Sequence, residues 1–172
     1  MASIVNIDCF KGYYDLSTNK YSLVDLQSYI DQYEEYYLCK LLGNELRDLL
    51  LLDLLDGVPQ DPEYLEWFNP FCKEDTCCGS CYEIQSQGVK KMLTGFIYYH
   101  FLKDDNYRHT ITGGVVSKNE NSEVLSPWNI VRVADQRYND SVISFNAIRK
   151  CFLDNSCCKN ICEMKLKFGD LI

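Results

Sequence analysis

The stretch that decides the fold is EIQSQGVKKMLTGFIYYHFLK, residues 83–103. Its apolar residues recur at intervals of three and four, the spacing that places them on one side of an α-helix. They are Ile84, Val89, Met92, Leu93, Phe96, Ile97, Tyr99 and Leu102. Burying this much apolar surface is the main driving force of folding. We therefore predict a helix from Glu83 to about Lys103 and expect it to form the core.

Helices are also predicted on the N-terminal side of this segment. Within residues 22–104, Ser22 and Asp25 resemble a capping box, and apolar residues at helical spacing follow. Gly43 interrupts that pattern, so two helices that meet at this glycine are favoured over one rod. The second helix is leucine-rich and is expected to stop at Gly57 and Pro59.

Two more helices begin with a capping residue followed by a proline. Asp61-Pro62 starts a short helix that Pro70 ends, and a cysteine-rich loop over residues 69–82 follows it. Ser126-Pro127 starts a helix of about seven turns, given the rise of 1.5 Å per residue. Residues 126–172 are accordingly predicted as a long helix and a C-terminal tail.

The remaining segments show little helical spacing. Residues 105–125 are predicted as an inserted hairpin, in which Gly113-Gly114 supplies the positive φ angles of a tight turn. Residues 1–21 alternate irregularly, and we expect an extended arm with at most a short strand. The predicted fold class is mainly α: one domain over residues 1–172, a small bundle of about four main helices with an inserted β-hairpin and a long C-terminal helix.

Composition limits the class of protein. A chain of 172 residues has room for one core, and 47% hydrophobic with 24% charged residues excludes wholesale disorder. No run reaches the roughly 18 apolar residues of a membrane span, and the start lacks signal-peptide features, so we expect synthesis in the cytoplasm and no membrane partner. The net charge is −8, made up of −6 in residues 1–60, −4 in residues 61–105 and +2 in residues 106–172. Such an acidic surface argues against tight, sequence-independent DNA binding.

No enzyme signature is present. The chain has two histidines, His100 and His109, and no phosphate-binding glycine loop. We interpret His100 as a partly buried helix residue. The acidic pairs Glu34-Glu35 and Asp104-Asp105 are interpreted as solvated faces, because adjacent residues on a helix point in different directions.

The tyrosines leave two interpretations open. There are thirteen, and the first long helix carries Tyr29, Tyr33, Tyr36 and Tyr37 around more than one face. Tyrosine suits sites where one side is buried and the other is wet. The four side chains therefore either finish the edge of the core or form a contact with another subunit.

Ten cysteines need an explanation of their own. Cys9 and Cys39 stand apart, and the other eight form two groups, over residues 72–81 and 151–162. Cys78 and Cys81 have zinc-knuckle spacing, and Cys158 and Cys162 can share one helical face. A structural zinc site made of these four cysteines is the interpretation we favour, with disulfides and reduced free thiols as open alternatives.

Three parts of the sequence carry a resemblance to a known family. They are YYLCKLLGNEL at 36–46, GVKKMLTGFIYYHFL at 88–102, and ENS at 120–122 together with RYNDSV at 137–142. These stretches resemble the head-to-tail connector proteins (neck ring or adaptor proteins) of tailed bacteriophages, particularly the crAss-like group. The likeness covers about residues 23–153 and includes the order of the helices. The two cysteine groups are a departure from the family.

The resemblance implies a structural virion protein. Connector proteins form a closed ring, expected here to be a dodecamer, below the portal protein, and they contact neighbouring neck or tail ring proteins. The genome DNA passes through the ring without specific binding, and no catalytic residue is carried over. The location implied is the neck of the virion. The alternative is a small zinc-binding adaptor or regulatory protein with a cysteine-rich surface for its partner.

Overall fold

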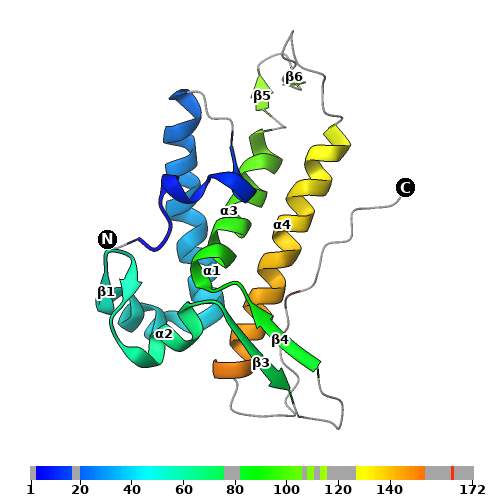
Figure 1. Cartoon of the computed structure of the whole chain (residues 1–172). Helices are drawn as coiled ribbons and strands as arrows, with labels where there is room; N and C mark the ends of the chain where they lie inside the picture. The colour runs from blue at the N-terminus through cyan, green and yellow to red at the C-terminus, as the bar shows by residue number, and fades with distance from the viewer. Residues whose placement is uncertain are drawn as a thin grey trace.

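The computed structural model describes residues 3–16, 20–75, 82–105, 108–110, 113–115, 127–153 and 164. Over these residues the chain is mainly helical, and the predicted small bundle of four helices with an inserted hairpin is confirmed. Figure 1 shows helix α3 (Val89–Asp105) between α1 (Lys20–Asp53) and α4 (Pro127–Ile148). The helix expected to form the core is therefore the central one.

Helix α3 contacts both neighbours through aromatic rings. The ring of Phe96 stacks on that of Tyr37 from α1 at 3.9 Å between centroids, and it meets Tyr138 from α4 edge-on at 5.3 Å. Phe96 itself has no exposed surface. Edge-to-face and stacked pairs add roughly 0.5–1.5 kcal/mol each beyond the burial of their area. The spacing of apolar residues in the sequence is thus realised as one core between three helices.

The packing of α3 against α4 depends on Gly95. A Cβ atom at this position would overlap the Oγ atom of Ser141 and would lie 3.0 Å from the carbonyl oxygen of Arg137. Both of those residues belong to α4, so the two helix backbones approach each other at this point. A residue without a side chain is what allows that approach.

Helix α1 bends where the sequence predicted two helices. Gly43 has φ 76° and ψ 173°, which are not helical values, and it divides the leucine-rich second half from the tyrosine-rich first half. The second half ends at Asp53. Strands β1 (Leu54–Leu55) and β2 (Val58–Pro59) then pair in a short antiparallel turn.

The short helix α2 (Pro62–Phe68) follows its capping signals. The side chain of Asp61 accepts a hydrogen bond from the backbone N–H of Glu63 at 2.9 Å, and a proline occupies the first turn. The predicted start and the predicted stop before Pro70 are both confirmed. Trp67 and Phe68 are buried, which fixes the helix against the bundle.

The segment after α2 differs from the prediction. Part of the expected loop at 69–82 is strand β3 (Phe71–Asp75), and it pairs with strand β4 (Tyr82–Ser86). Helix α3 therefore begins at Val89 and not at Glu83. The reason is Gly88, which has φ +84°, and whose Cβ would lie 2.7 Å from the carbonyl oxygen of Phe68. The backbone turns there in the left-handed region, which ends the strand and starts the helix.

The inserted hairpin is present, but Gly113 and Gly114 lie in a strand and not in the turn. Strand β5 (Arg108–Thr110) pairs with β6 (Gly113–Val115), and Gly113 is opposite Thr110. The two glycines were predicted to form the turn, and this prediction is wrong because they belong to β6. Helix α4 continues into the π-helical turn η3 (Arg149–Leu153), so the long helical segment reaches the predicted length.

The N-terminal segment is not the extended arm that we expected. Its described residues form two 3-10 turns, η1 (Ile7–Cys9) and η2 (Gly12–Tyr14), and no strand. Ile4, Val5 and Tyr14 are buried in the same core as the helices. A strand is unnecessary because a side chain of α1 binds the backbone N–H groups of Ile4 and Val5.

Candidate functional site

The second half of α1 and the β1–β2 turn expose a row of large apolar side chains. Their exposed fractions are 56% for Leu49, 85% for Leu52, 60% for Leu55 and 42% for Val58. Leu49 and Leu52 are three residues apart on the helix, and Leu55 is the strand partner of Val58. We call these four residues the leucine ridge. Apolar side chains grouped in this way mark an interaction site more often than scattered ones do.

The ridge is held by hydrogen bonds at its base. The carboxylate of Asp53 accepts from the backbone N–H groups of Gln60 and Asp61, at 2.7 and 2.8 Å. This closes the β1–β2 turn onto the end of α1. Leu50, on the other side of the helix, is fully buried in the core. The leucines of this helix therefore lie on two faces: Leu50 packs in the core, and Leu49 and Leu52 face outward.

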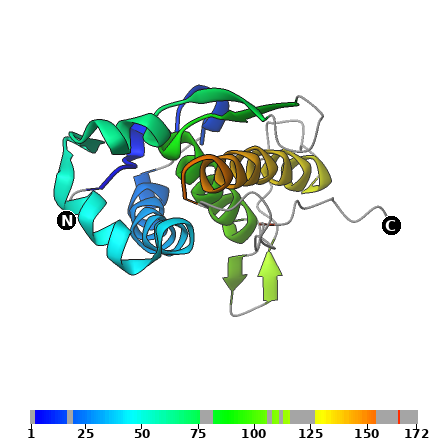
Figure 2. The same cartoon turned by 90° about the horizontal axis from the view of Figure 1, so that it is seen from below.

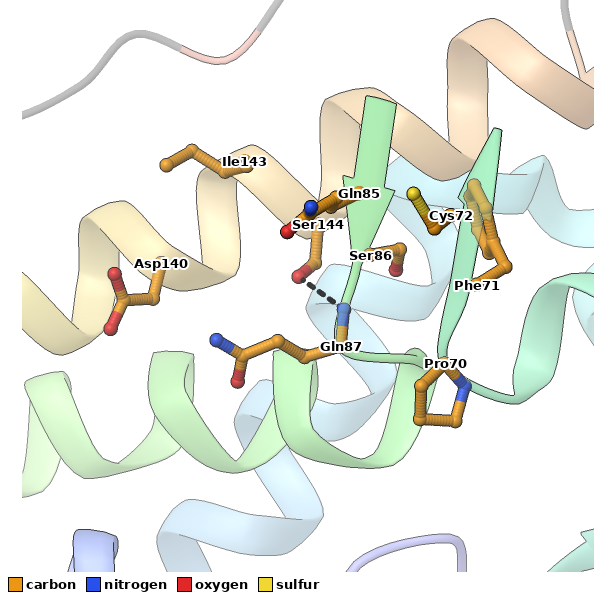
Figure 3. Close-up of a pocket in the computed structure, with 9 residues that line it drawn as sticks. All are labelled: Pro70, Phe71, Cys72, Gln85, Ser86, Gln87, Asp140, Ile143 and Ser144. Atoms are coloured by element: carbon orange, nitrogen blue, oxygen red, sulfur yellow. Dashed lines mark hydrogen bonds between the residues drawn. The ribbon is translucent and has the colours of Figure 1, made fainter. Parts of the chain in front are cut away.

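A second feature is a groove between strands β3–β4 and helix α4. Figure 3 shows its lining residues, which are Pro70, Phe71, Cys72, Gln85, Ser86, Gln87, Asp140, Ile143 and Ser144. The volume is about 520 Å³. Ile143 is 52% exposed at its edge, and Ser144 Oγ accepts a hydrogen bond from the backbone N–H of Gln87 at 3.0 Å. We call this feature the strand–helix groove.

The ridge and the groove lie on opposite sides of the molecule. The turn of β1 and the end of α1 occupy one side in both Figure 1 and Figure 2, and α4 with β3–β4 occupies the other. The chain thus presents exposed apolar side chains on one side and, on the other, a groove with both polar and apolar lining residues.

The tyrosines of α1 mostly serve the protein's own core. Tyr29 donates a hydrogen bond to Asp104 at 3.0 Å, Tyr37 is 2.8 Å from Nε2 of His100, and Tyr33 stacks on the same imidazole at 3.9 Å. The sequence left two interpretations open, and for Tyr29, Tyr33 and Tyr37 the structure favours the first: their side chains finish the edge of the protein's own core. Tyr36 alone of the four is exposed, at 52%.

His100 is half-buried in this aromatic cluster, as interpreted from the sequence. Burial raises the pKa of the Tyr37 phenol, its partner, well above the usual range, with smaller contributions from neighbouring tyrosines. The phenol therefore stays protonated at neutral pH. A hollow of about 480 Å³ borders the cluster and is lined by Gln32, Tyr33, Glu35, Tyr36, Tyr37 and His100.

Glu34 corrects one prediction from the sequence. The Glu34-Glu35 pair was interpreted as a solvated face, and Glu35 is indeed exposed, but Glu34 is only 6% exposed. Its carboxylate accepts from the backbone N–H groups of Ile4 and Val5, at 3.0 and 2.9 Å, and from the Ser3 hydroxyl at 3.0 Å. Burial raises the pKa of this carboxyl above its usual value, and the three hydrogen bonds oppose that rise. Its role is to hold the N-terminal segment.

Comparison with known families gives one result. Residues 38–156 match the model of DUF6712, a family of unknown function. The chain belongs to the DUF6712 family. The matched region contains the leucine ridge and the strand–helix groove, and it leaves out Glu34 and the N-terminal segment. No curated protein and no solved structure matches the chain.

The four candidate zinc ligands of this DUF6712 protein, Cys78, Cys81, Cys158 and Cys162, lie outside the described residues. Among the residues that are described, no group of three or more cysteine, histidine or acidic side chains is placed to hold a metal ion. Three cysteines in that part of the chain, Cys9, Cys39 and Cys72, have free thiols.

The two elements from which the cysteine groups start are in contact. The ring of Phe71 on β3 meets that of Phe152 on η3 edge-on at 5.1 Å between centroids. The Nζ atom of Lys73 lies 3.8 Å from the centroid of the same Phe152 ring. Cys72 and Cys151 are the immediate neighbours of these residues. The sequence predicted that the two groups approach at one end of the bundle, and their first members lie on elements that touch.

Within the described helices of this family member, none is both long and apolar enough to cross a membrane.

Proposed function

We propose that this DUF6712 protein is a structural subunit of the head-to-tail connector of a tailed phage, where copies form a closed ring. The observation that carries the proposal is the leucine ridge, because Leu52 is 85% exposed and no described part of the chain covers it. A protein that worked as a monomer would gain nothing from this surface and would risk aggregation. A subunit of a permanent ring would bury it.

The resemblance of three stretches to phage connector proteins supports the same role. Two of them, at 36–46 and 137–142, lie on α1 and α4, and the one at 88–102 is nearly all of α3. The resemblance thus involves the three helices that build the bundle. In this role the partners are further copies of the chain, the portal protein and the neighbouring neck or tail rings. No residue is assigned a catalytic part.

The charge of the chain suits a channel for DNA. With a net charge of −8, a ring of these subunits repels the phosphate backbone and lets it pass without being held. The test of the proposal has two parts. Mass spectrometry of purified virions should find the chain among the structural proteins, and electron cryomicroscopy should find it in the neck. A chain that is absent from the particle overturns the proposal.

A second candidate is a small zinc-binding adaptor. The contacts of Phe152 with Phe71 and Lys73 favour it, because they bring together the elements from which both cysteine groups start. Zinc content and solution mass of the purified protein separate the candidates. A zinc-loaded monomer favours the adaptor, and a metal-free ring favours the connector.

A further inference from the structure

The leucine ridge needs a partner, and the charge around it limits which one. Residues 44–61, which carry the ridge, contain Arg47 and five acidic residues, a net charge of −4. The only described partners of Arg47 among acidic side chains are Glu35 and Asp48, at 3.5 and 2.6 Å, so its charge is already compensated. A contact between two ridges would therefore place −4 against −4. Like charges that face each other across an interface disfavour such a contact.

The strand–helix groove offers the apolar side chains of Pro70, Phe71 and Ile143, and the elements that form it do not carry that repulsion. Its elements, residues 71–75, 82–86 and 127–153, contain five basic and five acidic residues and so have no net charge. Ile143 stands at its edge with half of its surface exposed, and Phe71 lines it from strand β3. The groove is a hollow of about 520 Å³, large enough to take exposed apolar side chains such as those of the ridge.

We infer that the ridge of one copy docks into the strand–helix groove of the next copy. Because the two surfaces lie on opposite sides of the chain, each copy keeps one free ridge or one free groove after a contact forms. Assembly therefore runs head to tail and ends only when the last copy meets the first. The inference rests on the proposed function, since it names the surfaces through which that ring closes.

Two substitutions block the two surfaces separately. Leu52→Asp adds a charge to the ridge and leaves the groove intact, and Ile143→Asp does the reverse. Both side chains are more than half exposed, so folding should be preserved, and circular dichroism checks this. Sedimentation velocity should show self-association of the wild type. Each variant should weaken it about tenfold or more, as the loss of a central apolar contact does.

Mixing the two variants tests whether the ridge of one copy binds the groove of another. The intact groove of Leu52→Asp can accept the intact ridge of Ile143→Asp, so an equimolar mixture should form a 1:1 dimer that grows no further. Ile7→Asp is the matched control, because it makes the same kind of change at a residue that is 37% exposed and outside both surfaces. This control should associate like the wild type.

Three results would overturn the inference. They are self-association of Ile143→Asp at wild-type strength, a mixture that stays monomeric, and a wild-type chain that is monomeric at about 1 mM, the concentration at which even weak specific contacts form. Rings that survive both substitutions would remove this interface and leave the connector role intact. Absence of the chain from the virion would remove the connector role and leave a measured ridge–groove contact standing.

Discussion

At the scale of single residues, Glu34 has more structural effect than its sequence suggests. It joins residues 3–5 to α1 through three hydrogen bonds to a buried carboxylate. A buried charge is tolerated only when such bonds replace the water it has lost. The N-terminal segment covers part of the core, so the bonds at Glu34 affect the stability of the whole bundle.

Glu34→Gln is expected to lower the free energy of unfolding by about 1–3 kcal/mol, because an amide has one acceptor oxygen and its NH₂ group would face a backbone donor. Urea denaturation at neutral pH measures the change. Glu35→Gln is the matched control, since Glu35 is exposed. It should change stability by no more than about 0.5 kcal/mol. Equal effects of the two variants would contradict the role of Glu34.

Glu34 also predicts a direction of pH dependence. Its pKa in the folded protein is raised above the usual carboxyl value of 4.5, mainly by burial, so the folded state holds the proton more tightly than the unfolded chain does. The stability that this protonation contributes is fully present below pH 4.5 and is lost as the pH rises through the folded pKa. The difference in unfolding free energy between wild type and Glu34→Gln should therefore fall as the pH rises above 4.5. A rise would contradict the assignment.

Gly95 gives a prediction about the contact between α3 and α4. Gly95→Ala should destabilise the protein by about 1–3 kcal/mol, because the added methyl group overlaps Ser141 Oγ and the helices must move apart. Thermal or urea unfolding measures the loss. Adding Ser141→Ala to this variant should recover part of it, since the overlapping atom is then removed. No recovery would mean that the backbone near Arg137 sets the limit.

At the scale of residues, the sequence predicts contacts that form between near neighbours in the chain. Asp61 was predicted as a cap because a capping bond is formed within two residues. Glu34 was assigned to solvent because its partners, 29 to 31 residues away, come from a segment with no helical or strand pattern. The exposed leucines were missed as a surface for a related reason. Apolar spacing shows that a helix is amphipathic, but it does not show how much of that face the rest of the chain covers.

At the scale of elements, helices were predicted better than strands. The helical spacing of α3 and the kink at Gly43 are properties of a single segment. Strand β3, by contrast, exists only because it pairs with β4, and the sequence of Phe71–Asp75 has three charged or polar side chains next to each other. Strand formation depends on the partner strand and on packing more than on intrinsic preference.

The two cysteine groups start at the end of the bundle where β3 contacts η3, and we predict that a crosslink there stabilises the fold. If zinc or disulfides join the groups that start there, the crosslink closes a long loop, which is worth about 3 to 5 kcal/mol in the chain-entropy model. The matching reagent, a chelator or a reductant, should lower the unfolding temperature and leave the helical circular dichroism of the bundle in place. If neither reagent changes the unfolding temperature, the thiols are free and no such crosslink joins the two cysteine groups.

At the scale of the whole molecule, the ridge and the groove lie on opposite sides, and the segment that carries the ridge, residues 44–61, has a net charge of −4. The fold explains this arrangement. The bend at Gly43 separates the leucine-rich half of α1 from its tyrosine-rich half, while strand β4 packs against α4. A chain with two such different sides suits repeated head-to-tail contacts, which close into a ring when the rotation between copies divides the circle evenly.

Electron cryomicroscopy of the neck of a phage that carries this chain tests the connector role most directly. The account predicts a closed ring of this chain between the portal and the tail, of about twelve copies if it matches the symmetry of portals, with each leucine ridge buried against a neighbour. A single copy of the chain in the particle, or a two-fold dimer, would contradict it.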